Sequence, residues 1–83
     1  MRGAVESRKE RVSFVARRLD KNLAEKGKVD YEIFIVKICI ETGVTDKKAR
    51  EYLRLVMASN DLETELEQTK TGRIYWIKPK LEG

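Results

Sequence analysis

The chain has 83 residues, of which 41% are hydrophobic and 39% are charged, and its formal net charge is +4. This composition is typical of one folded domain with a highly charged surface, and it excludes a disordered tail. No apolar run approaches the roughly 20 residues of a membrane span, and the N-terminus lacks an apolar signal-peptide core. We therefore expect a soluble, cytoplasmic protein.

The content of histidine and cysteine limits the kinds of catalytic and metal site that the chain can form. The sequence has no histidine and one cysteine, Cys39. Histidine is the commonest general base and the commonest metal ligand, and a single thiol supports neither a disulfide nor a zinc site. There is also no phosphate-binding glycine motif. We therefore expect a protein that is not an enzyme and uses no metal and no cofactor.

The positive charge is concentrated at the start of the chain. Residues 1–28 hold nine Lys or Arg against four Asp or Glu, residues 29–60 hold five against five, and residues 61–83 hold four against five. A basic segment of this kind is one signature of nucleic-acid binding. Abundant Lys, Arg and Glu beside one Gln and two Asn is a bias seen in proteins from hot environments.

The first predicted element is a long helix over residues 7–26. Ser7 and Glu10 have the spacing of a capping box, and Gly27 follows the last turn. Phe14 lies almost opposite the apolar stripe of this helix, so we expect either a single exposed aromatic side chain or part of a dimer contact. The stripe itself, which should face the core, comprises Val5, Val12, Val15, Ala16, Leu19 and Leu23.

Residues 31–42 predict a second helix, although their β-branched side chains favour a strand by propensity. Asp30 is a suitable N-cap, and Gly43 can adopt the positive φ that ends a helix. Because this helix would be apolar on nearly every side, we expect it to form the buried centre of the domain.

A tight turn then leads into a third helix over residues 46–59. Thr45 is a good N-cap, and Asp46 places a negative charge in the first turn. The spacing i, i+3, i+4, i+7, i+8 gives an apolar stripe of Ala49, Tyr52, Leu53, Val56 and Met57. The opposite face is polar and carries Lys47, Lys48, Arg50, Glu51 and Arg54.

Residues 62–78 predict two strands joined by the turn 69–72. Period-two alternation in the first strand indicates one buried face. The other face is a row of carboxylates, Asp61, Glu63, Glu65 and Glu67. The second strand is rich in strand formers, and Pro79 closes the domain.

A helix-turn-helix followed directly by such a hairpin resembles the winged helix-turn-helix family of DNA-binding proteins, over about residues 12–78. The resemblance implies an α+β fold in a single domain, residues 1–83, with three helices followed by a two-stranded β-hairpin wing. It also implies a transcriptional regulator that reads the major groove of double-stranded DNA with the helix 46–59 and contacts the backbone with the wing. The alternative is a winged-helix module that binds a protein partner and has no affinity for DNA.

The resemblance assigns DNA contact to the polar face of the third helix, to the wing turn and to a basic cluster of the first helix. These residues are Lys47, Lys48, Arg50, Glu51, Arg54, Lys70, Arg73, Arg17 and Arg18. The carboxylate row would repel phosphate, so DNA must approach the tip and the other edge of the hairpin. The basic first helix is alternatively a solvated face or a contact to the acidic strand of a second copy.

We expect a homodimer, because helix-turn-helix proteins often place two reading helices on successive turns of the duplex. Phe14 and Trp76 are the predicted interface residues. The resemblance implies that Tyr75 and Ile77 pack inward and that Ile74 and Trp76 are partly exposed. If the register of the strand is the opposite one, Trp76 belongs to the core.

Overall fold

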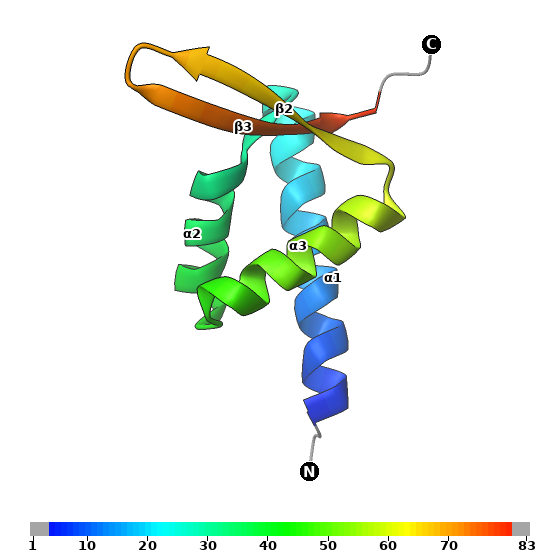
Figure 1. Cartoon of the computed structure of the whole chain (residues 1–83). Coiled ribbons are helices and arrows are strands. Elements are labelled where there is room, and N and C mark those ends of the chain that lie inside the picture. The colour runs from blue at the N-terminus through cyan, green and yellow to red at the C-terminus, as the bar shows by residue number, and fades with distance from the viewer. Residues whose placement is uncertain (1–3, 81–83) are drawn as a thin grey trace.

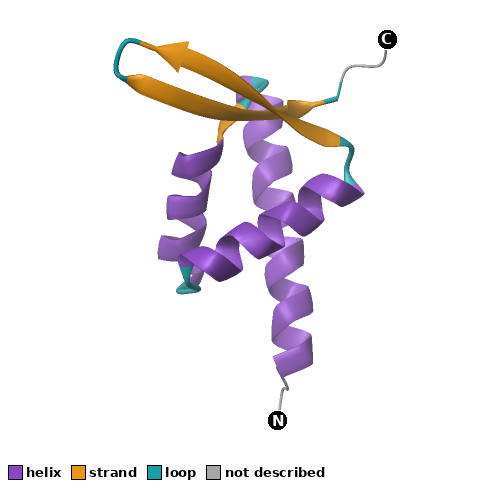
Figure 2. Cartoon of the chain, viewed as in Figure 1, coloured by secondary structure: helices purple, strands orange, loops and turns teal. Residues whose placement is uncertain are grey.

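The computed structural model of the chain describes residues 4–80, with side chains from residue 9 onward. Three helices precede a hairpin, and a short strand between the first two helices completes a three-stranded sheet (Figures 1 and 2). The fold is therefore α+β, as predicted. Within residues 4–80, no helix combines the length and the hydropathy that crossing a membrane requires. The elements in chain order are α1 (Ala4–Lys26), β1 (Val29–Asp30), α2 (Tyr31–Thr42), α3 (Asp46–Ser59), β2 (Leu62–Thr69) and β3 (Gly72–Pro79).

Helix α1 begins earlier than the sequence predicted. Because the backbone is helical from Ala4, Ser7 lies inside the helix, and its assignment as the N-cap is wrong. The side chains of Ser7 and Arg8 fall outside the described part of the chain. Gly27 ends the helix with a φ of 82°, and its N–H donates to the carbonyl of Leu23 at 2.8 Å. The N-terminal half of α1 extends beyond the other two helices (Figure 1).

Local hydrogen bonds fix the ends of α2 and α3, whose bounds coincide with the predicted ranges. The Asp30 carboxylate accepts from the N–H of Ile33 at 3.1 Å, and the Thr45 hydroxyl accepts from the N–H of Lys48 at 3.2 Å. Between the two helices Gly43 adopts a φ of 78°. These caps define a tight turn that sets α3 across α2.

The sheet has the order β1-β3-β2, and both pairings are antiparallel. Val29 pairs with Ile77 where β1 meets β3, and Thr69 pairs with Gly72 beside the two-residue turn of the hairpin. The hairpin is longer than the sheet that covers the helices, so its tip extends past α2 into solvent (Figure 1).

The core lies where the three helices meet the base of the hairpin. Val15, Leu19, Leu53 and Ile77 have no solvent exposure at all. The other buried apolar residues are Val29, Phe34, Ile35, Ile38, Ala49, Tyr52 and Val56. Each helix and two of the strands therefore contribute to one cluster.

Helix α2 is buried on one side only, which corrects the expectation of a helix surrounded by the core. The buried side consists of Phe34, Ile35 and Ile38. Ile33 and Val36 are each 54% exposed and Ile40 is 76% exposed. Within residues 4–80 no element covers the outer face of α2.

The last strand behaves as predicted at its base and differently toward its tip. Ile77 is fully buried, but Tyr75, on the same face of β3, is 42% exposed, so its predicted burial is wrong. The reason is position along the hairpin, because Tyr75 lies nearer the tip, away from the helices. Ile74 and Trp76 are half-buried on the opposite face.

Two isoleucines of α2 give a matched test of this arrangement. Ile38 is 1% exposed and Ile40 is 76% exposed. We expect Ile38→Ala to lower the free energy of unfolding by about 2–5 kcal/mol, because it leaves a cavity. Ile40→Ala should change it by no more than about 0.5 kcal/mol. Urea unfolding followed by circular dichroism measures both, and equal losses would show that Ile40 is covered in solution.

Candidate functional site

The outer face of α3 is the first part of the candidate site. The buried stripe of α3 faces the core and turns Lys47 and Arg54 to solvent. These two residues are seven positions apart, so they lie on one face of the helix about 10 Å apart along its axis. Within the described part of the chain neither forms an ion pair, so both charges are available to a ligand.

A weak ion pair lies beside these two cations. Lys48 Nζ is 3.8 Å from Glu51 Oε1, and both side chains are about half exposed. Exposed pairs of this kind contribute only about 0.2–1 kcal/mol. A polyanion that approaches α3 can therefore separate Lys48 from Glu51 at little cost.

Arg50 has a different environment from the other cations of α3. Its Nη1 and Nη2 donate to the two carboxylate oxygens of Glu32 on α2, at 3.0 and 2.6 Å, and its Nε donates to Asp46 at 2.8 Å. The guanidinium also lies 5.8 Å from the centre of the Tyr31 ring. All three nitrogens are thus engaged, and Arg50 joins the first turn of α3 to the first turn of α2.

These contacts of Arg50 with Glu32 and Asp46, which we call the Arg50 clamp, shift the pKa values of Arg50 and Glu32. The hydrogen bonds from Arg50 hold the pKa of Glu32 below its ordinary value of 4.5. The carboxylates of Glu32 and Asp46 raise the pKa of Arg50 further above its ordinary range, so it stays charged. A base contact by Arg50, as predicted from the sequence, would have to compete with these two carboxylates.

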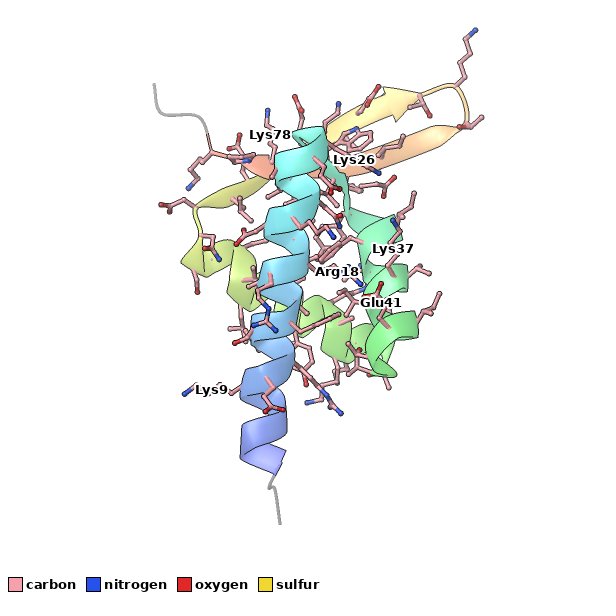
Figure 3. The ribbon with its side chains drawn as sticks, turned by 180° about the vertical axis from the view of Figure 1, so that it is seen from behind. Lys9, Arg18, Lys26, Lys37, Glu41 and Lys78 are labelled. Carbon is pink, nitrogen blue, oxygen red and sulfur yellow. The ribbon has the colours of Figure 1, made fainter. Side chains whose placement is uncertain are left out.

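The two predicted arginines of α1, Arg17 and Arg18, also differ in whether a carboxylate of the chain engages them. Arg18 donates from Nη2 and Nε to one oxygen of Glu41 on α2, at 2.7 and 3.1 Å (Figure 3). The guanidinium also lies 5.5 Å from the centre of the Phe14 ring. This ring is half-buried against the core, whereas the helical wheel predicted a side chain directed away from it. Arg17, by contrast, is exposed and makes no ion pair with any described residue.

The tip of the hairpin is the second part of the candidate site. Lys70 lies in the two-residue turn and Arg73 lies one residue into β3, and both are exposed. The turn is fixed from within, because the Thr69 hydroxyl donates to the carbonyl of Gly72 at 2.9 Å. Neither cation pairs with a carboxylate anywhere in residues 9–80.

The carboxylate row of β2 lies on the other face of the hairpin from Arg73. The register pairs Glu63 with Lys78 and Gln68 with Arg73, and odd and even positions of β2 point to opposite faces. Lys78 Nζ lies 3.9 Å from Glu63 and 3.4 Å from Glu65. The row is therefore partly neutralised, and it does not face the same side as Arg73.

The indole of Trp76 occupies the same face as the carboxylate row. Its Nε1 donates to Glu67 Oε1 at 2.7 Å, and Lys28 Nζ lies 4.3 Å above its ring. Trp76 is half-buried, which agrees with the partial exposure that the resemblance implied.

The structure thus divides the predicted DNA-contact residues into three groups. Arg18 and Arg50 connect helices, and Lys48 pairs with Glu51 on the surface of α3. The predicted cations that are exposed and have no ion pair among the described residues are Lys47, Arg54, Lys70, Arg73 and Arg17. Sequence reasoning missed the three lysines gathered beside Trp76, namely Lys26, Lys28 and Lys37. Their only signal in the sequence was charge, and nothing in their spacing indicated that they meet.

No part of the described chain brings together three side chains able to hold a metal ion. The chain matches no protein family, no curated protein and no solved structure. Its own residues therefore supply the evidence on function.

The Arg50 clamp makes a prediction about Glu32. The pKa of Glu32 should rise toward its ordinary value in Arg50→Met, because the hydrogen bonds that favour the carboxylate are lost. Since the folded-state pKa lies below the unfolded one, the pair stabilises the fold above the unfolded pKa and loses this effect as pH falls through the folded pKa. The stability difference between wild type and Arg50→Met should therefore vanish in acid.

An NMR titration of the Glu32 side-chain carboxyl measures the shift. Arg54→Met is the matched control, because it removes an exposed arginine from the same helix without touching Glu32. A pKa that does not move in Arg50→Met would contradict the clamp.

Proposed function

We propose that this protein is a winged helix-turn-helix protein that binds double-stranded DNA and acts as a transcriptional regulator. The observation that carries the proposal is the set of exposed cations, without ion pairs among the described residues, on α3 and at the hairpin tip. The start of α3 and the tip of the hairpin also extend toward the same side of the molecule, the side of α2 (Figure 1). One duplex would then meet both.

In this proposal the residues of α3 have separate roles. Lys47, beside the helix start, suits a phosphate, and Arg54 suits a bidentate contact to a guanine edge. Glu51 lies between them on the polar face of α3 and pairs with Lys48. Arg50 is a positioning residue, because its contacts to α2 set the angle at which α3 is presented.

The hairpin would contact the backbone beside the reading helix. Lys70 and Arg73 project from its tip, and the carboxylates of β2 lie on the face opposite Arg73. This arrangement supports an approach of DNA from the Arg73 face, where phosphate meets no row of carboxylates. The repulsion expected from the sequence is thereby reduced.

A homodimer remains part of the proposal as a prediction. Two copies would place two α3 helices on successive turns of a duplex. Phe14 lies half-buried beneath Arg18, so a dimer through Phe14 has to displace that side chain. Trp76 is the alternative contact.

The α3 assignment predicts the effect of a double substitution. Lys47→Ala with Arg54→Ala should weaken binding to a target selected from random duplexes, by about 1–3 kcal/mol for each lost base contact. A titration of labelled duplex at fixed salt measures the change in Kd.

The matched control removes the same charge from exposed positions elsewhere. Lys9 lies near the far end of α1 and Lys80 follows β3 (Figure 3 labels Lys9). Lys9→Ala with Lys80→Ala should keep most of the affinity. Equal losses in the two double variants would mean that net charge alone drives binding, and the assignment to α3 would be wrong.

The hairpin makes a prediction of another kind. Lys70→Ala with Arg73→Ala should lower affinity for all sequences alike, because phosphate contacts carry no sequence information. The slope of log K against log salt should fall by about one for each lost contact. A salt series on random duplex measures it, and a loss confined to one target sequence would assign base reading to the hairpin instead.

A further inference from the structure

A pocket of about 240 Å³ lies between the end of α1, the start of α2 and Trp76 of β3. Its apolar lining comprises Val29, Ile33, Phe34 and Trp76. No residue of α3 lines it, and neither do Lys70 and Arg73 of the hairpin tip, so the pocket shares no residue with the proposed DNA contacts. It is smaller than the roughly 300–1,000 Å³ of small-molecule sites, and its size fits a side chain of a bound peptide.

The rim of this pocket is strongly cationic. Lys26, Lys28 and Lys37 line it from three different segments, and none makes an ion pair among the described residues. The single carboxylate in the lining is that of Asp30, which already accepts the N–H of Ile33 as the cap of α2. Figure 3 shows Lys26 and Lys37 on the face that is hidden in Figure 1.

Trp76 is held in place before any ligand arrives. Glu67 accepts from its indole N–H at 2.7 Å and Lys28 lies 4.3 Å above its ring. Because the Trp76 side chain is already held by these contacts, it loses little further conformational entropy when a ligand binds. Beyond Ile33 the exposed apolar surface continues along α2 through Val36 and Ile40, so a segment longer than one residue has a surface to follow.

From these observations we infer that the pocket binds an acidic peptide segment of another protein, with a bulky apolar side chain inserted between Ile33, Phe34 and Trp76. The carboxylates of the segment meet Lys26, Lys28 and Lys37, and its apolar residues lie along α2. Nucleic acid fits this surface less well, because phosphates offer nothing to the exposed isoleucines. A second copy also fits less well, because helices α2 paired antiparallel would bring the two Lys37 side chains close together.

The test begins with random peptides displayed on phage and selected against the whole chain. Enriched peptides should combine several Asp or Glu with one or more bulky apolar residues. Their affinities are then measured with synthetic peptides through the fluorescence of Trp76, the only tryptophan in the chain.

Charge reversal at the rim, Lys26→Glu with Lys37→Glu, should weaken peptide binding at least about tenfold, because like charges then face each other. The control Lys9→Glu with Lys80→Glu carries the same charge change and should bind as the wild type does. Ile33→Ser, at a half-exposed position, should weaken binding while circular dichroism shows an unchanged fold. Absent enrichment, enrichment of peptides without acidic residues, or affinity that survives the rim reversal would each overturn the inference.

Two further outcomes distinguish an acidic peptide from nucleic acid and from a second copy of the chain as the ligand of the pocket. If the rim reversal weakens binding to random duplex DNA as strongly as the loss of Lys47 and Arg54 does, the lysines belong to the nucleic-acid surface and the inference fails. If sedimentation shows a dimer that Ile33→Ser dissociates, a second copy covers the pocket and the inference also fails. The peptide titrations do not depend on whether α3 binds DNA, so a failure of the peptide inference is distinguishable from a failure of the DNA proposal.

Discussion

Val15 and Leu19 of α1 are completely buried, and the arrangement of the remaining elements depends on covering them. Burial of one such side chain contributes about 1.5–3 kcal/mol. A domain of this size buries only about 60% of the surface of its unfolded chain, so few such contributions are available. α2, α3 and the base of the hairpin each present one apolar face to this cluster. Their other faces are left free, and both candidate binding surfaces lie there.

The parts of the fold that depend on neighbouring residues were predictable. Asp30, Gly43 and Thr45 act within a few positions of themselves, and they placed both ends of α2 and the start of α3 correctly. The burial of Tyr75 and of the outer face of α2 depends instead on how far the helical layer extends. No local pattern contains that information, because the same apolar residue is buried or exposed according to what lies opposite.

The candidate site shows the same division between local and distant causes. The helical period predicted which residues of α3 face away from the core, and these include Lys47 and Arg54. It did not predict that Arg50 is engaged by Glu32, which lies 18 positions earlier, or that Arg18 is engaged by Glu41, which lies 23 positions later. Whether a basic residue is already engaged by a carboxylate of its own chain depends on tertiary structure, and the helical period does not contain that information.

The carboxylates of β2 acquire a further meaning from the order of the sheet. β2 is an edge strand, so one side of its backbone carries N–H and C=O groups that β3 does not use. Such an edge is a template on which another extended chain adds as an extra strand. If two copies joined edge to edge through β2, Glu63, Glu65 and Glu67 of each would lie against a strand bearing the same charges. The acidic strand thus disfavours the pairing of two copies through this one edge, although the hairpin extends into solvent.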